Sequence, residues 1–493
     1  MSAARPASFH EASTTAAPSL SVRAVGYGER MPLGRLTPGL RDARLIEFIG
    51  PDPATNFHFV QAMMEAGLVV REVETPSGQA DALVLAHGLS GEAVDAHAGA
   101  VTKLSKAAAV FENQGGTLIL LQDTGGTFQP RDDRAWRGGL TGLGRTAQKE
   151  FASATVRTID IDVAAFGPRP AADRVVEELL SGGNAACVGI SASGRFVPTE
   201  AACVLPKNRV GSIGPGDTFL VTGGARGVTA SCIIELARRT NAAFVLLGRS
   251  AIEDWPEDID PTSDERSLRG ALARRAKASG QKVSPADLNR QAARLLAGTE
   301  IREALNALSA AGSRAHYAIA DVADAQAVQT AVESASQMFG PITGLVHGAG
   351  VLADKLIREK TADQVTRVFG PKVVGLQNII SAIDTSALKH IAFFSSVAAR
   401  YGNAGQSDYA MANEVLNRVA QWLKAANPSA CITSLGWGPW DGGMVDDSLR
   451  AKFAEMGVAL IPRQAGADLF ADAMLAGAAC PVELVIGSEL ANG

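Results

Sequence analysis

The chain has 493 residues, too many for one hydrophobic core of ordinary size, so we expect at least two domains. Hydrophobic residues make up 46% and charged residues 20% of the sequence, a composition typical of water-soluble globular proteins. A net charge of −5 argues against nucleic acid as the main partner. The sequence contains no apolar run of about 18 residues, which argues against a membrane-spanning segment.

The cysteines indicate the compartment. The sequence contains Cys187, Cys203, Cys232, Cys431 and Cys480. These cysteines lack CxxC or Cys/His spacing, which predicts a reducing cytoplasm and no metal site. The N-terminus shows no apolar core of a signal peptide. Residues 1–25, which contain many Ala, Ser and Thr, are predicted to be disordered or to form a linker.

Residues 26–210 are predicted to form the first α/β unit. Strands are expected at residues 45–49, 68–70, 81–85 and 117–121, and helical spacing covers residues 56–66. This alternation is typical of a parallel sheet with helices on both faces. The turn after the first strand contains Pro51 and Pro53, where a phosphate cradle needs glycines and free backbone N–H groups. We therefore predict a degenerate, structural Rossmann-like subdomain.

Residues 211–493 are predicted to form a second, catalytic unit, after a linker containing Pro206, Gly211, Gly214 and Pro215. Strands are expected at 218–222, 243–247, 315–320, 344–347 and 390–394, and helices at 229–239, 324–338 and 361–382. These elements predict a doubly wound parallel sheet with its ligand at the carboxyl ends of the strands. An insertion at about 251–300 is expected to be solvated and helical, with amphipathic segments at 287–296 and 300–310; a partner-docking surface is the alternative.

A glycine-rich turn follows the strand at 218–222 and opens a helix. Gly223 and Gly227 allow a pyrophosphate to approach the backbone at the helix N-terminus, while Thr229 stands where a third glycine is often found. The residues expected to bind a dinucleotide are Thr222, Gly223, Gly224, Arg226, Gly227, Val228, Arg249, Asp321, Val322, Gly348, Ala349 and Gly350. A tight turn without a ligand is the alternative.

The residues after the strand expected at 243–247 indicate which dinucleotide is bound. Arg249 stands there, with no Asp or Glu to hold a ribose 2′-hydroxyl, and a guanidinium suits a 2′-phosphate. Arg226 in the glycine turn can reinforce it, so NADPH is expected rather than NADH. Asp321 and Val322 are placed to meet the adenine edge, although Asp321 can equally cap a helix.

Ser396 is followed after thirteen residues by Tyr409, and Asn413 lies one helical turn beyond. A hydroxyl and a phenol at this spacing, downstream of a nucleotide cradle, are the outline of a carbonyl reductase. Alone, Ser396 can be read as a strand-end cap and Tyr409 as a core aromatic; the joint spacing favours catalysis. Many such reductases carry lysine where Asn413 stands, so the ammonium must come from elsewhere.

These motifs resemble the short-chain dehydrogenase/reductase superfamily, and more closely the ketoreductase domains of type I polyketide and fatty-acid synthases. The segments His347–Gly350 and Trp437–Trp440 are similar to two further motifs of that family. The resemblance covers nearly all of the chain beyond residue 40 and implies one cofactor-free and one catalytic dinucleotide fold. The insertion is similar to that of ketoreductases in polyunsaturated-fatty-acid synthases.

The resemblance also supplies the missing lysine, because in these ketoreductases it comes from the helix before the catalytic strand, where Lys372 matches. It implies NADPH-dependent reduction of a 3-ketoacyl thioester to the 3-hydroxyacyl thioester. Tyr409 would donate the proton, Ser396 would bind the carbonyl oxygen, and Lys372 and Asn413 would complete a proton relay. The implied partners are an acyl carrier protein, with its phosphopantetheine-linked substrate, and other synthase domains.

Product configuration and a lid are further expectations. Family members that form the D product carry Leu-Asp-Asp where this chain has Leu352-Ala353-Asp354, so the second aspartate is retained. Members that form the opposite product often carry Trp where this chain has Tyr401. Both positions favour the D (3R) product. Residues 441–453 are expected to cover the substrate. A silent scaffold would have lost Lys372, Ser396 or Tyr409, and a sugar epimerase would carry lysine four residues after the tyrosine. A stand-alone reductase of free or coenzyme A-linked ketones stays an open alternative.

Overall fold

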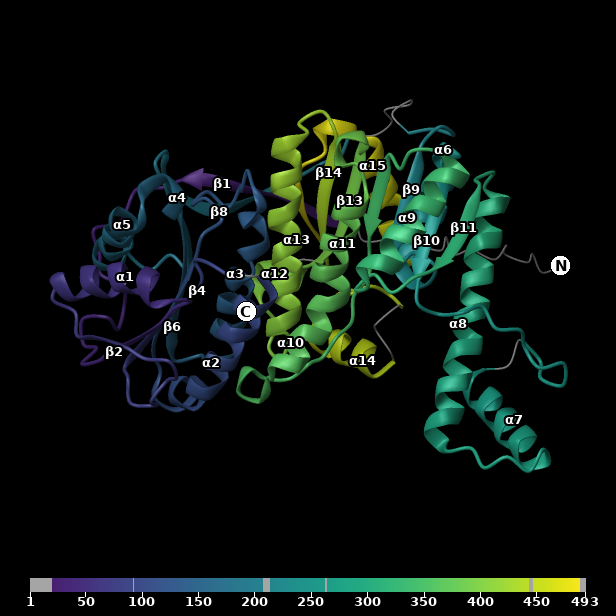
Figure 1. Ribbon diagram of the computed structural model, residues 1–493, viewed down its shortest axis with the longest axis horizontal. Coiled ribbons are helices and arrows are strands. Elements are labelled where there is room, and N and C mark those ends of the chain that lie inside the picture. Colours follow the sequence, from purple (N-terminus) through teal and green to yellow (C-terminus); the bar gives the residue numbers. More distant parts are fainter. Residues whose placement is uncertain (1–19, 92, 207–212, 262–263, 443–446, 488–493) are drawn as a thin grey trace, which may run out of the picture.

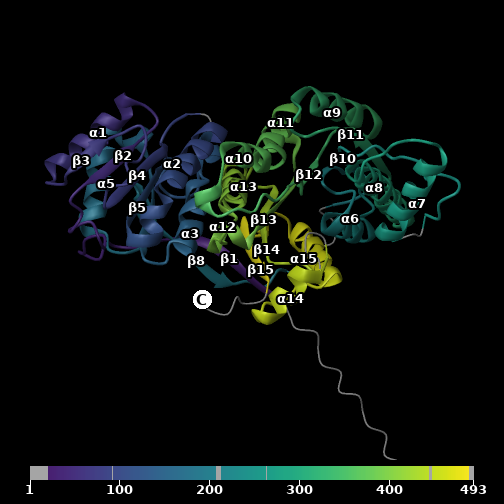
Figure 2. The same ribbon diagram turned by 90° about the horizontal axis from the view of Figure 1, so that it is seen from below.

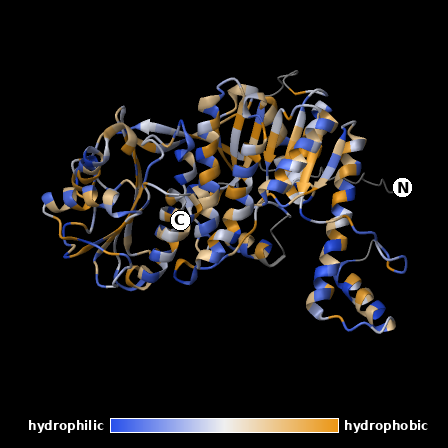
Figure 3. Ribbon diagram, viewed as in Figure 1, coloured by the Kyte–Doolittle hydropathy of each residue, from blue (hydrophilic) through white to orange (hydrophobic). Residues whose placement is uncertain are grey.

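The computed structural model describes residues 20–91, 93–206, 213–261, 264–442 and 447–487. One sheet of 15 strands runs through this part of the molecule, with helices packed along it (Figures 1 and 2). Its strand order is β11-β10-β9-β12-β13-β14-β15-β1-β8-β7-β6-β5-β4-β2-β3. Figure 3 shows hydrophobic residues concentrated along the central strands, as expected for strands that are buried on both faces.

The N-terminal half contains strands β2 (Ile46–Ile49), β3 (Val70–Glu72), β4 (Ala82–Gly88), β5 (Gly116–Gln122), β6 (Ala154–Ile161), β7 (Cys187–Ser191) and β8 (Gly194–Ala202). Its helices are α1 (Pro53–Glu65), α2 (Ala93–Gln114), α3 (Leu140–Glu150), α4 (Val163–Phe166) and α5 (Pro168–Ser181). Strands β2 to β7 are parallel, and β8 is antiparallel to β7. The proline-containing turn is a helix cap, because Asp52 accepts a hydrogen bond from Thr55 N at 2.8 Å and Pro53 begins α1.

The C-terminal half contains strands β9 (Thr218–Thr222), β10 (Ala243–Gly248), β11 (Ala315–Ile319), β12 (Gly344–His347), β13 (His390–Ser396), β14 (Cys431–Trp437) and β15 (Glu483–Gly487). Its helices are α6 (Gly227–Thr240), α7 (Glu265–Ala278), α8 (Pro285–Ala310), α9 (Ala325–Phe339), α10 (Ala362–Phe369), α11 (Gly375–Ala382), α12 (Val397–Tyr401), α13 (Ser407–Ala426), α14 (Asp447–Glu455) and α15 (Arg463–Leu475). All seven strands are parallel. The chain reverses direction across the sheet between β9 and β12, which creates the crevice where ligands bind in such folds.

Strand β1 (Ser21–Glu29) joins the two halves, since it pairs antiparallel with β15 on one side and β8 on the other. The predicted α/β class with two doubly wound units is confirmed, and β1 makes the two sheets continuous. The predicted linker at 1–25 is wrong for residues 21–25, which lie in β1; residues 1–19 lie outside the described part. The predicted boundary at residue 210 also lies outside it.

Arg418 holds the two halves together from α13. Its fully buried guanidinium donates to Glu483 Oε2 at 2.8 Å, and also to Phe128 O and the Tyr27 hydroxyl of the N-terminal half. The Tyr27 hydroxyl donates to the same Glu483 oxygen at 2.7 Å. A buried charge is tolerated only when it is paired and hydrogen-bonded in this way. The contacts fix α13 against the N-terminal half.

The insertion is built differently from the prediction. The two amphipathic segments form one continuous helix, α8, and α7 packs against its first half through Leu268, Leu272, Ala292 and Leu295. The second half of α8 buries Ile301 and Leu308 in the core beside β10. Thus the crossover helix between β10 and β11 is extended at its N-terminus, and its extension with α7 projects from the body (Figure 1).

No helix in the described part of the chain is both long enough and apolar enough to span a bilayer.

Candidate active site

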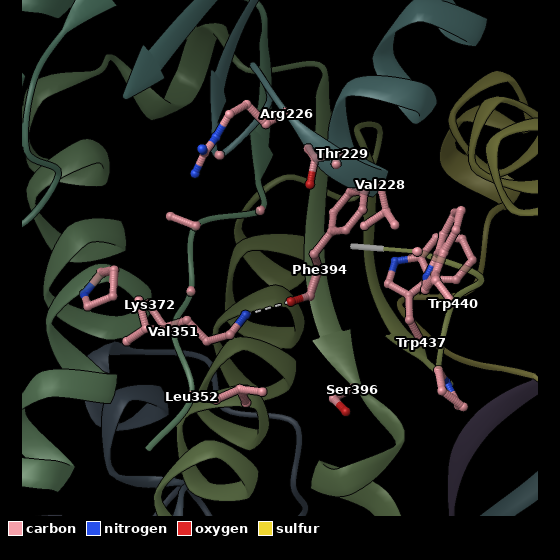
Figure 4. Close-up of a pocket in the computed structure, with 18 of the residues that line it drawn as sticks. Arg226, Val228, Thr229, Val351, Leu352, Lys372, Phe394, Ser396, Trp437 and Trp440 are labelled. Atoms are coloured by element: carbon pink, nitrogen blue, oxygen red, sulfur yellow. Dashed lines mark hydrogen bonds between the residues drawn. The ribbon is translucent and has the colours of Figure 1, made fainter. Parts of the chain in front are cut away.

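A cavity of about 1550 Å³ lies at the carboxyl ends of β9, β10, β12 and β13 (Figure 4). Predicted site residues that line it are Gly223, Arg226, Gly227, Val228, Arg249, Asp321, Val322, Gly348, Ala349, Gly350, Lys372, Ser396 and Tyr409. Thr222, Gly224 and Asn413 are buried behind its wall. The structure therefore brings the predicted cofactor and catalytic residues to one cavity.

The glycine turn packs directly on the segment after β12. Gly223 has φ +67°, and a Cβ there would lie 2.8 Å from Gly348 O, so only glycine fits. Helix α6 begins at Gly227, and no side chain of the preceding Arg226 caps it. Its first N–H groups are therefore available to an anion, which fits a dinucleotide pyrophosphate.

The two arginines predicted to select NADPH lie at one end of the cavity. Arg226 is 50% exposed and lies 3.6 Å from Glu300, and Arg249 is 69% exposed and lies 3.7 Å from Asp321. Exposed pairs at these distances contribute little free energy, about 0–1 kcal/mol. Both guanidiniums are thus free to exchange these carboxylates for a phosphate. Asp321 also accepts from Ala323 N at 3.0 Å, so it caps the turn after β11.

Helix α8 supplies cavity residues that the sequence did not reveal. Glu300, Glu303, Ala304 and Ala307 line the cavity beside the arginines, together with Tyr317 of β11. The sequence predicts an amphipathic helix over residues 300–310, but its place beside the cavity depends on how α8 packs against the sheet, which a local pattern does not show. The helical spacing over 300–310 was the available signal.

Helix α14 forms another wall. Leu449, Lys452 and Phe453 on this helix and Met456 after it line the cavity near the tryptophans of the 437–440 segment. The predicted lid at 441–453 includes residues 443–446, which lie outside the described part. Among its described residues, Arg450 pairs with Asp441 at 2.6 Å.

Ser396 and Tyr409 come from consecutive elements. Ser396 ends β13, and its Oγ accepts from Ala398 N at 3.1 Å, so the residue also caps α12. Tyr409 lies in the first turn of α13. Burial raises the pKa of Tyr409 above its ordinary value, and the polar side chains of Asn413 and Ser396 only partly offset this rise. The phenol therefore stays protonated at neutral pH.

Asn413 stabilises the turn that carries Tyr409. Its Nδ2 donates to Tyr409 O at 2.8 Å, and its own carbonyl accepts from Ser395 Oγ at 3.1 Å. Its Oδ1 is buried and has no hydrogen-bond partner in the described part of the chain. Helix α13 is thereby attached to strand β13 beside Ser396.

Lys372 occupies a π-helical turn, η3 (Gly370–Val374), between α10 and α11. Its Nζ donates to Phe394 O at 2.8 Å (Figure 4). The same Nζ lies 5.7 Å from the centre of the Tyr409 ring. The side chain is almost fully buried, and burial lowers its pKa from 10.5 to about 7. The structure thus brings an ammonium to the tyrosine from a position 37 residues earlier in the chain.

His347 connects the π-helical turn that carries Lys372 to Thr222, the residue before the glycine turn. Its Nε2 lies 2.9 Å from Lys372 O, and its Nδ1 lies 2.9 Å from Thr222 Oγ1. A carbonyl only accepts, so Nε2 carries the proton and Thr222 donates to Nδ1. Burial lowers the pKa of His347 to about 3, which keeps the ring neutral. Sequence reasoning assigned His347 only to a motif and missed this link.

The corresponding edge of the N-terminal sheet holds an ion cluster. Arg134 pairs with Asp123 and Asp162, which follow β5 and β6, at 2.8 and 2.9 Å, and with Asp132 at 2.9 Å. Burial raises the pKa of Asp123 to about 6. In strand order β5 and β6 correspond to β13 and β14, so the cluster stands where the other half carries Ser396 and the 437–440 segment.

A doubly wound parallel sheet that carries Ser, Tyr and Lys beside a glycine turn defines a short-chain dehydrogenase/reductase type of oxidoreductase. Residues 217–442 match the model of the KR domain family. The chain belongs to this family of ketoreductase domains of polyketide and polyunsaturated-fatty-acid synthases. The resemblance inferred from the motifs is confirmed.

Two curated relatives illustrate the match. One is a component of the polyunsaturated fatty acid synthase of Thraustochytrium, which is 37% identical over 374 residues, covering 72% of this chain and 13% of the relative. The other is polyketide synthase PksL of Bacillus subtilis, which is 30% identical over 240 residues, covering 48% of this chain and 4% of the relative. The chain therefore spans only a small part of these relatives.

Solved structures show the same fold. A ketoreductase domain from the bacillaene assembly line matches with a TM-score of 0.67 and 20% identity, over 95% of this chain and 97% of that one. A structure of A-type ketoreductases from a modular polyketide synthase matches with a TM-score of 0.69 and 20% identity, over 94% and 92% of the two chains.

Proposed function

We propose that this domain uses NADPH to reduce a 3-ketoacyl thioester, carried by an acyl carrier protein, to the 3-hydroxyacyl thioester. The observation that carries this proposal is the meeting of Ser396, Tyr409 and Lys372 in one cavity with the glycine turn. Each comes from a different element, and the cavity lies at the switch point of the sheet. A silent scaffold has no need to keep this arrangement.

The residues present fit NADPH. The open N-terminus of α6 suits the pyrophosphate, and Arg226 and Arg249 suit a 2′-phosphate. When bound, the nicotinamide supplies the hydride. Ser396 would donate a hydrogen bond to the substrate carbonyl oxygen, where negative charge develops. Tyr409 would deliver the proton to that oxygen.

Lys372 and Asn413 would support this proton transfer. The ammonium, held by Phe394 O, would stabilise the phenolate that remains after Tyr409 has lost its proton. The Oδ1 of Asn413, which has no partner among the described residues, is available to a relay that returns a proton to the phenol. Positioned proton transfer of this kind contributes about 10²–10⁴-fold in rate.

The carrier-bound substrate and the D configuration are part of the same proposal. The relatives are multidomain synthases, which supports a carrier protein and neighbouring synthase domains as partners. Asp354, retained from the motif for the D product, lines the cavity and accepts from Gln406 Nε2 at 3.0 Å. A reductase of free or coenzyme A-linked ketones is the rival function.

The test is NADPH oxidation with acetoacetyl thioesters of a carrier protein, of coenzyme A and of a small thiol, followed by chiral analysis of the product. We expect the highest kcat/KM with the carrier protein and an excess of the D product. Equal kcat/KM for all thioesters would favour the stand-alone reductase. Failure to reduce any of them would contradict the proposed activity.

Removing either cofactor arginine should raise the KM for NADPH. Arg226→Ala and Arg249→Ala each lose one charge-assisted contact, so we expect an increase of about tenfold, with KM for NADH unchanged. Steady-state kinetics with both cofactors measure the effect. Arg238→Ala is the control, because Arg238 is 57% exposed and pairs with Glu235 in the last turn of α6, away from the cavity. An unchanged NADPH/NADH preference in both variants would refute the cofactor assignment.

A further inference from the structure

Two segments border the cavity near Tyr409, and we name them the substrate loops. The first, residues 350–360, follows β12, and the second, residues 402–408, leads to Tyr409. Their residues Asp354, Asn403 and Gln406 line the cavity. The position of a substrate relative to the Tyr409 hydroxyl therefore depends on how these loops are held.

The substrate loops are bonded to each other at three points. Lys355 N donates to Gly405 O at 2.9 Å, and Gln406 Nε2 donates to Asp354 Oδ2 at 3.0 Å. Lys360 Nζ donates to Asp408 Oδ2 at 2.8 Å, and both side chains are fully buried. The two loops thus form one unit that includes the residue next to Tyr409.

Glu150 attaches this unit to the N-terminal half. It is the last residue of α3, and each of its carboxylate oxygens accepts a backbone N–H from a different loop. Oε2 accepts from Ile357 N at 2.7 Å, and Oε1 accepts from Gly405 N at 2.8 Å. One half-buried side chain therefore links both substrate loops, although it is 207 and 255 residues away from them in sequence.

The backbone of α3 touches the same region independently of Glu150. Gly402 has φ +69°, and a Cβ there would lie 2.3 Å from Arg145 O. Arg145 Nη1 also donates to Ala399 O at 2.6 Å. These contacts show that α3 packs against the second substrate loop and against α12, the helix that precedes it.

We propose that Glu150 is a positioning residue for the reductase reaction, so that the N-terminal half helps to align the substrate. This inference rests on the proposed function. The carboxylate has two acceptors for two N–H donors; the amide of glutamine has one acceptor and places N–H₂ against the other donor. Releasing a loop would shift Asp354 and Gln406 relative to Tyr409. This shift would change which face of the flat ketone is turned toward the nicotinamide.

The test compares Glu150→Gln with Glu150→Asp, which keeps the charge and both acceptors on a shorter stem. For Glu150→Gln we expect kcat to fall about tenfold, the minor enantiomer to increase and the Kd for NADPH to stay unchanged. Glu150→Asp should recover part of the loss. Hydrogen exchange should be faster in peptides covering 353–360 and 402–408.

Glu112→Gln is the matched control. Glu112 on α2 pairs across the same interface with Arg358 at 3.4 Å, but this contact is to a side chain rather than to loop backbone.

Wild-type kcat, product ratio and exchange in Glu150→Gln would overturn the inference, as would slow turnover with unchanged exchange. If the wild type reduces no 3-ketoacyl thioester, the proposed function fails, while exchange still tests the attachment. Melting temperatures show whether each variant folds. If Glu150→Gln does not fold, the kcat, product ratio and hydrogen exchange of Glu150→Asp test the inference instead.

Discussion

Tyr409→Phe is expected to lower kcat for a 3-ketoacyl thioester by about 10³-fold or more, because it removes the proposed proton donor. The pKa of this phenol is raised by burial, so in the wild type the proton is present throughout the neutral range. The ring is retained, and its packing beside Lys372 should be unchanged. The Kd for NADPH is expected to stay within about twofold of the wild-type value, because the cofactor groups lie on other elements.

Tyr317→Phe provides the comparison for this loss. It also removes one hydroxyl inside the cavity, which donates to Ser250 O at 2.8 Å at the arginine end. We expect this change to affect KM for NADPH and to leave kcat nearly unaltered. Single-turnover measurement of thioester reduction separates the two effects. Rapid turnover by Tyr409→Phe would show that another group delivers the proton.

The sequence predicted the second half well because its signals are local. Buried parallel strands appear as apolar runs, and the Ser396, Tyr409 and Asn413 spacing is set by one strand and the helix after it. The glycine turn is equally local, since Gly223 adopts a positive φ that glycine reaches readily. Such features need no knowledge of the rest of the chain.

Contacts between distant segments could not be predicted in this way. Strand β1 has little apolar alternation, and only its pairing with β8 and β15 explains why residues 21–25 are ordered. Lys372 was assigned through a family resemblance, because spacing alone does not show that a π-helical turn brings it to Tyr409. No local pattern shows the roles of Glu150 and His347, because these roles arise from hydrogen bonds to segments distant in sequence.

Lys372→Met is expected to abolish most of the activity and yet stabilise the fold below pH 7. In the part of the chain that the structure describes, the buried ammonium pairs with no carboxylate and donates to Phe394 O. Burial lowers its pKa from 10.5 to about 7, so the charged form is disfavoured in the folded protein. Methionine fills a similar volume without this cost.

The pH dependence of this gain has a definite sign. Below pH 7 the lysine is charged in both the folded and the unfolded state, so the whole cost of burying the charge is present. Between pH 7 and 10.5 only the unfolded state binds the proton, so the wild type gains stability as the pH rises. The advantage of Lys372→Met should therefore be greatest at pH 6, on the order of a few kcal/mol, and smaller at pH 9.

Urea unfolding of both proteins at pH 6 and pH 9 measures this difference, with Lys389→Met as the control. Lys389 is 62% exposed and pairs with Asp217 at 3.3 Å, so its removal should change the free energy of unfolding by less than about 1 kcal/mol at either pH. A Lys372→Met variant that is less stable at pH 6 would mean that the hydrogen bond outweighs the cost of burial. A stabilised but inactive variant would mean that the fold tolerates an unfavourable buried charge at Lys372 because the proton transfer at Tyr409 requires it.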